Sequence, residues 1–213
     1  WYALDPISGR FIFRRASWEK AKGWGKSPFV AANSIAEFAG PVLFDGWDAD
    51  GEPVAKPWGF GEDPPPWVQI AAVSEDQTEN TYGAIYAYLT ANDHRAASDL
   101  GIDQGRTRLY LKGRSGRLEP VTASAGSREG QRTTHAVLDE THLWTKRNGG
   151  QRLAAVLRRN LAKMSGRSIE TTNAPTLGEN SVAEDTGNLA EIGEPGILHF
   201  ATRPSREPQP DDT

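Results

Sequence analysis

Two short apolar runs place the strongest constraint on the fold. Residues 67–73 (WVQIAAV) are almost continuously apolar, and residues 136–138 form a second run of the same kind. A strand that is buried on both faces of a parallel sheet has this pattern. Because further strand candidates alternate with helix candidates, the sequence predicts an α/β domain with a mostly parallel central sheet flanked by helices. The other strand candidates are residues 10–17, 109–111, 119–124, 168–172 and 197–201.

The first helix candidate lies between the first two strand candidates. Residues 29–38 have helical spacing, with Phe29, Ala32 and Ala36 near one face. Gly40 and the proline after it should end this helix.

Two further helices and one irregular segment are expected. Ser74 should cap a helix that runs to about Ala91, with Gln77 completing a capping box. Residues 151–164 are the last helix candidate, and residues 45–66 are rich in Gly, Pro and Asp. We expect residues 45–66 to form a surface segment without regular structure.

The composition of the 213 residues excludes several classes of site. With a net charge of −4, any contact with DNA must be local rather than spread over the surface. The absence of cysteine excludes disulfides, CxxC zinc sites and thiol nucleophiles, and it fits a reducing cytosol. No apolar stretch reaches the roughly 18 residues of a membrane span, and the start lacks the plan of a signal peptide. We therefore expect a soluble, intracellular protein without a membrane partner.

Residues 20–27 (KAKGWGKS) resemble a phosphate-binding loop. They match G-x-x-x-x-G-K-[ST] at every defined position except the first, where Lys20 replaces glycine. Gly23 and Gly25 let the backbone bend so that successive N–H groups face a phosphate, and the positive end of the next helix adds to the attraction. Lys26 can reach the β- and γ-phosphates, and the Ser27 hydroxyl can ligate Mg²⁺. The candidate nucleotide-binding residues are Lys22, Gly23, Trp24, Gly25, Lys26 and Ser27.

An ordinary glycine-containing turn is the alternative reading of this segment. The strand that feeds a phosphate loop is usually buried and apolar, yet this one carries Arg14 and Arg15. Pro28 is compatible with the phosphate loop, because proline is tolerated in the first turn of a helix.

An acidic pair follows the second apolar run. Asp139 and Glu140 come directly after residues 135–138 (HAVL). Ligands of open α/β sheets gather at the carboxyl ends of strands, where the phosphate loop also lies. Asp139 can hold Mg²⁺, and Glu140 can polarise the water that attacks the γ-phosphate. A solvated acidic turn is the alternative, but the phosphate loop about 110 residues earlier argues against it.

At this point four segments resemble successive motifs of the large terminase subunit of tailed phages. They are GWGKSPF, VQIAAVSEDQTEN, SAGSREGQRTTHAVLDETHLW and ETTNAP, in the order found in that family. Terminase loops commonly lack the first glycine and carry a basic residue at the position of Lys22. The resemblance implies a P-loop NTPase fold of the ASCE type, with ATP as substrate and Mg²⁺ as cofactor. It also implies that ATP hydrolysis drives double-stranded viral DNA into a procapsid.

The resemblance also implies roles for single residues. Asn173 is the polar residue of the coupling motif, although a plain strand end entering a turn is the alternative there. Arg128 is the candidate trans-acting arginine finger, with a solvated loop arginine as the alternative. Lys22 is the candidate for a cis-acting role, and Arg132 is the alternative finger. These residues join Glu140 as the candidate catalytic set, with Ser27 and Asp139 as metal ligands.

The same resemblance implies partners and a domain plan. A large terminase acts with a portal protein, a small terminase subunit and other copies of itself in a ring on the procapsid, in the host cell cytoplasm at the portal vertex. Residues 1–203 are then the ATPase motor domain, and residues 204–213 a linker or tail toward a missing nuclease domain. The chain begins at Trp1 rather than Met, so we expect a fragment, with Trp1 and Tyr2 as the remnant of an adenine-contacting segment.

Two other functions are alternatives to a packaging motor. A helicase-like ATPase that acts on nucleic acid would need a second motor lobe with its own arginines, and none is present. A nucleotide-binding regulator that does not hydrolyse ATP is disfavoured by the presence of both Asp139 and Glu140.

Basic residues gather around a predicted hairpin made of residues 109–111 and 119–124. They are either a solvated ribbon or a contact with DNA phosphates or with an acidic face of the next subunit. His142 is placed to position Glu140, and Trp144 should pack behind the acidic strand. The basic residues are Arg106, Arg108, Lys112, Arg114 and Arg117.

Overall fold

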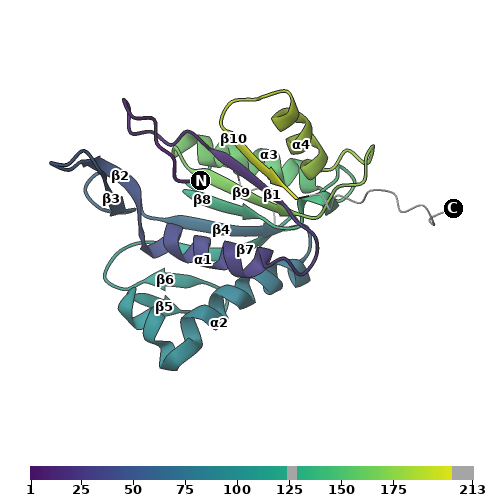
Figure 1. Cartoon of the computed structure of the whole chain (residues 1–213). Coiled ribbons are helices and arrows are strands. Elements are labelled where there is room, and N and C mark those ends of the chain that lie inside the picture. Colours follow the sequence, from purple (N-terminus) through teal and green to yellow (C-terminus); the bar gives the residue numbers. More distant parts are fainter. Residues whose placement is uncertain (124–128, 203–213) are drawn as a thin grey trace, which may run out of the picture.

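The computed structural model describes residues 1–123 and 129–202. It contains one large sheet, a separate two-stranded hairpin and four α-helices within these residues (Figure 1). The strands are β1 (Arg15–Glu19), β2 (Pro41–Trp47), β3 (Pro53–Pro57), β4 (Trp67–Ala72), β5 (Ile102–Gln104), β6 (Leu109–Leu111), β7 (Arg117–Thr122), β8 (His135–Leu138), β9 (Arg167–Thr172) and β10 (Ile197–Ala201). The helices are α1 (Lys26–Ala39), α2 (Glu75–Asp99), α3 (Gly150–Lys163) and α4 (Val182–Glu191), with a 3-10 turn η1 at Thr141–Leu143.

The large sheet has the strand order β10-β1-β9-β8-β4-β7-β6-β5. The six strands from β10 to β7 run parallel, and only β6 and β5 at one edge are antiparallel. Parallel neighbours need crossover connections, which α1, α2 and α3 help to supply. The predicted α/β fold with a mostly parallel sheet flanked by helices is confirmed.

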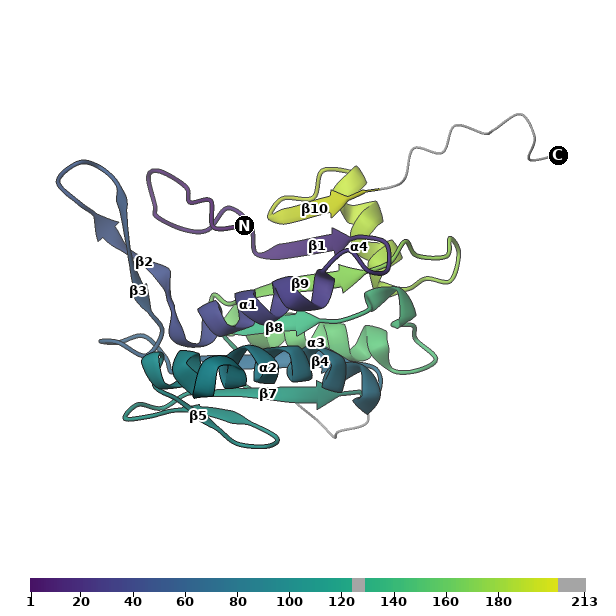
Figure 2. The ribbon, with the colours of Figure 1, turned by 60° about the horizontal axis from the view of Figure 1, so that its bottom comes forward.

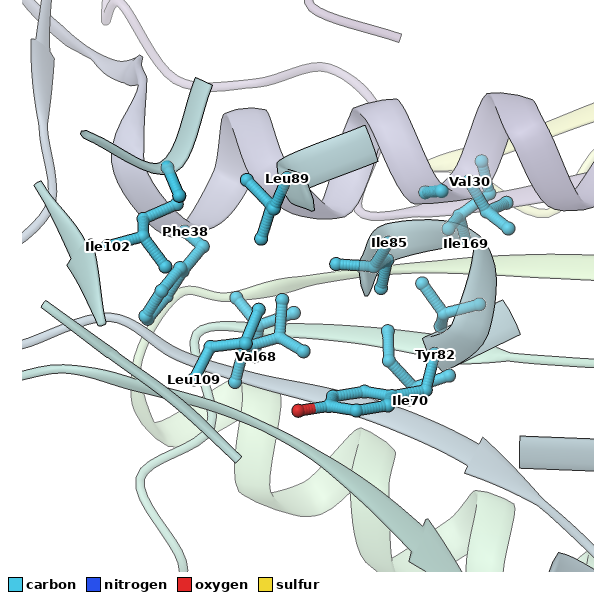
Figure 3. Packing of buried hydrophobic residues seen from close by; sticks show 14 of the residues in the cluster. Val30, Phe38, Val68, Ile70, Tyr82, Ile85, Leu89, Ile102, Leu109 and Ile169 are labelled. Atoms are coloured by element: carbon cyan, nitrogen blue, oxygen red, sulfur yellow. The ribbon is translucent and has the colours of Figure 1, made fainter. Parts of the chain in front are cut away.

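Helices cover both faces of the sheet (Figure 2). On the face of α1 and α2, Ile85 and Leu89 of α2 lie over Val68 and Ile70 of β4 (Figure 3). Ile70 has no exposed surface, and burial of such a side chain contributes about 1.5–3 kcal/mol. The next residue of β4, Ala71, belongs to the core on the face of α3, because side chains alternate along a strand. The run at residues 67–73 is thus buried on both faces, as predicted.

The first strand begins later than predicted and extends further. β1 starts at Arg15 rather than at residue 10, because the backbone of Phe11 pairs with Leu4 in an isolated bridge. The strand then continues to Glu19, next to Thr172 of β9. Trp18 and Glu19 therefore belong to the sheet.

The charge of Arg15 is neutralised inside the fold. Its guanidinium lies 3.3 Å from the carboxylate of Glu170, which has no exposed surface, and it donates a 2.7 Å hydrogen bond to the Thr186 hydroxyl. Arg14 is exposed. An arginine pair is therefore compatible with a strand that leads into a phosphate loop, because a partner on the neighbouring strand offsets the cost of burial.

Helix α1 does not bury the face that carries Phe29 and Ala32. Phe29 and Ala32 are exposed, whereas Val30, Ala31 and Phe38 are in the core. Phe29 instead packs on the ring of Trp18, with ring centroids 4.2 Å apart. Because α1 contains few large apolar residues, its sequence does not show which face of the helix packs against the sheet.

Residues 45–66 are not irregular throughout, as was predicted. β2 and β3 pair as an antiparallel hairpin that projects from the body of the domain (Figures 1 and 2). The Asp48 carboxylate accepts hydrogen bonds of 2.9 Å from the backbone N–H groups of Asp50 and Glu52, and Gly51 has a φ of 82°. Aspartate and glycine therefore form the hairpin turn that composition alone assigned to a loop.

Other boundaries also differ. α2 begins after Ser74 as predicted, but it continues to Asp99, and the Ser74 side chain makes no capping hydrogen bond, so the capping box is wrong. The strand β5 and the helix α4 had not been predicted. The hairpin of β6 and β7 is confirmed. Across residues 1–123 and 129–202, no helix combines the length and the apolar character that a membrane crossing requires.

Candidate nucleotide-binding site

The phosphate loop and the acidic pair meet at one edge of the sheet. Glu19 at the end of β1 pairs with Thr172 of β9, and Leu138 at the end of β8 pairs with Glu170 of the same strand. β9 therefore lies between the two motifs, and the chain segments after all three strands emerge at the same edge. Ligand sites of parallel α/β sheets lie at this edge.

Gly23 and Gly25 give the loop its shape. Their φ angles are 85° and 76°, in the left-handed region that favours glycine. A Cβ atom at Gly25 would meet nothing within 4 Å, so the backbone conformation rather than space requires glycine here. Gly25 is the N-cap of α1, and no acidic residue lies in the first turn of that helix. The positive end of α1 is therefore open to an external anion.

Lys26 turns its amine back onto the loop. The Nζ atom donates hydrogen bonds to the backbone oxygens of Lys20 (3.0 Å) and Ala21 (3.5 Å) and to the Asn173 side-chain oxygen (2.7 Å). Lys26 is buried, with 8% of its surface exposed, yet all three acceptors of its charged amine are neutral groups. Within the described residues no carboxylate forms an ion pair with this amine. The charge is thus held in place and remains available to a phosphate.

Asp139 is fixed through both carboxylate oxygens. The Thr81 hydroxyl donates to Oδ2 at 2.5 Å, and the Thr171 hydroxyl donates to Oδ1. The indole N–H of Trp144 donates to the Asp139 backbone oxygen at 2.8 Å, and Trp144 has no exposed surface. The prediction that Trp144 packs behind the acidic strand is confirmed. Thr81 was not predicted, because only the packing of α2 against the sheet brings it to the site.

Glu140 has an unusual backbone conformation. Its φ of 56° and ψ of 49° lie in the left-handed region, which costs a non-glycine residue about 1–3 kcal/mol. The side chain is half-buried, and this burial raises the pKa of the carboxyl group. Lys26 and Lys22 oppose that rise in pKa, while Asp139 adds to it. The carboxylate lies next to the residue that follows β9.

Asn173 joins the phosphate loop to the acidic pair. While its Oδ1 accepts from Lys26, its Nδ2 donates to Glu140 Oε2 at 3.3 Å. The imidazole Nδ1 of His142 also lies 3.2 Å from Glu140 Oε2, in agreement with the predicted contact. Lys26, Glu140 and Asn173, which are far apart in the sequence, therefore form one connected group.

The remaining candidates are placed differently. Lys22 is exposed on the loop, and its charge lowers the pKa of Glu140. Ser27 is half-buried at the second position of α1, and Trp24 is 61% exposed. Arg128 lies outside the described residues. Arg132 is exposed beside Trp67, which begins β4 at the opposite edge of the sheet, so it does not face the site of its own chain.

Trp1 and Tyr2 do not lie beside the phosphate loop. Their rings flank the guanidinium of Arg167 at 4.6 and 4.7 Å, and Arg167 begins β9 at the amino edge of the sheet. The prediction that they remain from an adenine-contacting segment is therefore wrong. They instead cover the buried ion pair between Arg167 and Glu37, whose nearest atoms are 2.5 Å apart.

Three of the basic hairpin residues make contacts with other residues of this chain. Arg108 forms a 2.8 Å ion pair with Glu119, and Arg117 stacks on the ring of Trp67 at 3.5 Å. Arg114 donates to the backbone oxygen of Trp58 at 2.8 Å. These contacts favour the solvated-ribbon reading of the hairpin over a free cationic surface.

The residues present fit a nucleotide with Mg²⁺. The loop supplies backbone N–H groups and a held ammonium for phosphates. Ser27 and Asp139 supply the hydroxyl and carboxylate oxygens that Mg²⁺ prefers beside water and phosphate oxygens. Asp139 retains acceptor capacity, because a carboxylate has about four lone-pair sites and the two threonines occupy two of them.

Comparison with known proteins agrees with the fold. The crystal structure of the HK97 bacteriophage large terminase superposes on 92% of this chain and 37% of its own, with a TM-score of 0.68 and 12% sequence identity. The chain has the fold of a phage large terminase. The fold that the resemblance of the motifs implied is therefore confirmed.

Two phage proteins are also similar to this chain in sequence. The Gene 13 proteins of Mycobacterium phages L5 and D29 are 38% and 36% identical to it over 190 residues. Each alignment covers 86% of this chain, and the chain spans about 30% of the length of these curated relatives. No family model matches the chain.

Proposed function

We propose that this chain is the ATPase motor domain of a large terminase subunit, which hydrolyses ATP to move double-stranded viral DNA into a procapsid. The observation that carries the proposal is the connected group of Lys26, Asn173 and Glu140 at the carboxyl edge of the sheet. It joins a phosphate-binding cation to a carboxylate base through one amide. The fold of the HK97 large terminase supports the same assignment.

Each residue then has a chemical task. The loop N–H groups and Lys26 bind the phosphates, with Lys26 moving from its neutral acceptors to the β- and γ-phosphate oxygens. Mg²⁺, held through Ser27 and Asp139, would supply positive charge to the phosphates. Glu140 accepts a proton from the water whose oxygen bonds to the γ-phosphorus, while the bond to the β-phosphate oxygen breaks. Burial raises the pKa of Glu140 and so makes its carboxylate a stronger base.

Asn173 gives hydrolysis a route to the rest of the domain. Its amide contacts both Lys26 and Glu140, and it follows the last residue of β9. When Lys26 leaves Asn173 for a phosphate, the amide loses one partner and can reorient. A change of nucleotide state would thereby reach β9, which is the step a motor needs to couple hydrolysis to movement.

The partners follow from the proposed role. The domain would work as a homo-oligomeric ring at the portal vertex of the procapsid, in the host cell cytoplasm, with the portal protein and a small terminase subunit. Lys22 and Arg128 are the proposed cis and trans cations that stabilise the charge on the transferring phosphoryl group.

The test is Glu140→Gln in the full-length subunit assembled on procapsids. Nucleotide binding should persist, because the phosphate loop is intact, while phosphate release falls at least about a hundredfold. Lys26→Ala is the matched control, since it should abolish nucleotide binding itself. Unchanged phosphate release by Glu140→Gln would refute the proposed function.

A further inference from the structure

His142 lies at the junction of the acidic pair and the end of β9. It is the middle residue of the η1 turn, directly after the left-handed residue Glu140. Its backbone N–H donates to the Thr172 hydroxyl at 3.0 Å, which attaches the turn to β9. The imidazole is half-buried, with Nδ1 3.2 Å from Glu140 Oε2 and Nε2 3.4 Å from Asn173 Nδ2.

The hydrogen bonds of Asn173 determine which imidazole nitrogen carries the proton. Because Asn173 Oδ1 accepts from the Lys26 ammonium at 2.7 Å, the nitrogen that faces His142 is the amide donor. His142 Nε2 must then accept, so the proton of the neutral ring is on Nδ1, which faces two acceptors, the Thr172 hydroxyl oxygen at 3.3 Å and Glu140 Oε2 at 3.2 Å. The opposite tautomer would accept from the Asn173 backbone N–H at 3.4 Å. However, its Nε2–H would then face the Asn173 amide donor, and the lone pair of its Nδ1 would face the Glu140 carboxylate.

A doubly protonated ring fits this arrangement no better, because its Nε2–H would face the Asn173 amide donor. Burial is the main cause that lowers the pKa of His142, and the positive charge of Lys26 lowers it further. Both effects favour the neutral ring with one donor and one acceptor.

Glu140 is thereby held through one oxygen. Oε2 lies within reach of both His142 Nδ1 and Asn173 Nδ2. Across residues 1–123 and 129–202, no hydrogen bond engages Oε1. A carboxylate that is fixed through one oxygen presents the other in a defined direction, which is what a general base needs.

We propose that His142 is a positioning residue that aligns the Glu140 carboxylate with the Asn173 amide. This inference rests on the proposed function, because it assigns a task within the same site. His142 acts through Glu140 and does not touch the substrate. Without the ring, Glu140 keeps its backbone conformation but loses one of the two close contacts that orient Oε2. Turnover should then fall while nucleotide binding by the loop remains.

The test compares three variants of the full-length subunit on procapsids. His142→Ala removes both contacts, His142→Asn keeps an amide at the position of Nδ1, and His142→Gln keeps one near Nε2. We expect His142→Ala to lower kcat about tenfold to hundredfold with KM for ATP changed by less than about threefold. His142→Asn should recover most of the lost kcat, because the contact with Glu140 dominates, and His142→Gln should recover less.

Two controls separate the possible outcomes. His94→Ala removes a histidine near the carboxyl end of α2, where the ring contacts Gln104. This change should leave kcat unchanged. Normal kcat in His142→Ala, or no recovery in His142→Asn, would overturn the inference. So would a joint loss of kcat, nucleotide binding and melting temperature in His142→Ala, since it would indicate a merely structural role. If Glu140→Gln retains full turnover, the proposed function itself fails. If Glu140→Gln is inactive while His142→Ala has normal turnover, the role of His142 is refuted and the proposed function stands.

Discussion

The Lys26 ammonium donates a 2.7 Å hydrogen bond to the side-chain oxygen of Asn173, across 147 positions of sequence. The first residue belongs to the phosphate loop and the second follows β9. A phosphate that draws Lys26 away must break this bond. The two residues therefore link nucleotide binding to the strand between the phosphate loop and the acidic pair.

Asn173→Asp should weaken ATP binding more than Asn173→Ala does. The new carboxylate would form an ion pair with Lys26 and compete with the phosphates for its charge. We expect at least about a tenfold loss of affinity for the aspartate variant, equal to about 1.4 kcal/mol. The alanine variant should keep its affinity but lose turnover. Titration with a fluorescent ATP analogue measures both affinities, and equal values for the two variants would contradict this role of Asn173.

Thr81→Val and Thr171→Val should each destabilise the domain. Either change keeps the side-chain shape but removes a hydroxyl donor from the buried carboxylate of Asp139. Loss of such a bond costs about 1–3 kcal/mol, measurable by chemical denaturation. The double variant should deviate from additivity, because both donors serve one carboxylate. Thr90→Val is the control, since the Thr90 hydroxyl donates to carbonyls of its own helix and the change should alter stability by less than about 0.5 kcal/mol.

His135 should make the domain less stable in acid. It has no exposed surface, and burial lowers its pKa from 6.5 to about 4. Between these pH values the unfolded chain binds more protons than the folded one, so the free energy of unfolding rises with pH. It should fall by up to about 3 kcal/mol as the pH drops through this window. Denaturation curves at several pH values for the parent and for His135→Gln measure the effect, because the variant should lack this dependence of the free energy of unfolding on pH. The same pH dependence in both proteins would exclude His135 as the cause.

Arg128 provides a test of the ring. If it acts in trans, an Arg128→Ala subunit binds ATP but fails to complete the site of its neighbour. Each of Arg128→Ala and Glu140→Gln should be nearly inactive alone, because loss of an arginine finger costs about 10³ to 10⁵ in rate. Mixed rings should recover part of the phosphate release, since some interfaces pair an intact base with an intact arginine. No recovery from rings shown to contain both variants would favour the cis cation Lys22.

Several features of the fold and the site could be predicted from the sequence, because they depend on the chemistry of neighbouring residues. The apolar runs at residues 67–73 and 136–138 predicted buried parallel strands, because short and nearly continuous apolar runs are typical of strands that are covered on both faces. Glycines before Lys26 and two acids after a buried strand indicated a phosphate loop and a carboxylate pair, and strand polarity placed both at one edge. The same local reasoning failed for residues 45–66, where it assigned Asp and Gly to a loop although they form a hairpin turn.

Tertiary structure alone decided the contacts that orient the site. Thr81, which holds Asp139, lies on a helix whose rotation depends on packing against the sheet and not on any local pattern. The exposed face of α1 and the ion pair between Arg15 and Glu170 were hidden for the same reason. The sequence by itself determined which residues could bind a nucleotide, because their chemistry and strand ends are local properties. The group formed by Lys26, Asn173, Glu140 and His142 exists only because the parallel sheet places β1, β9 and β8 side by side.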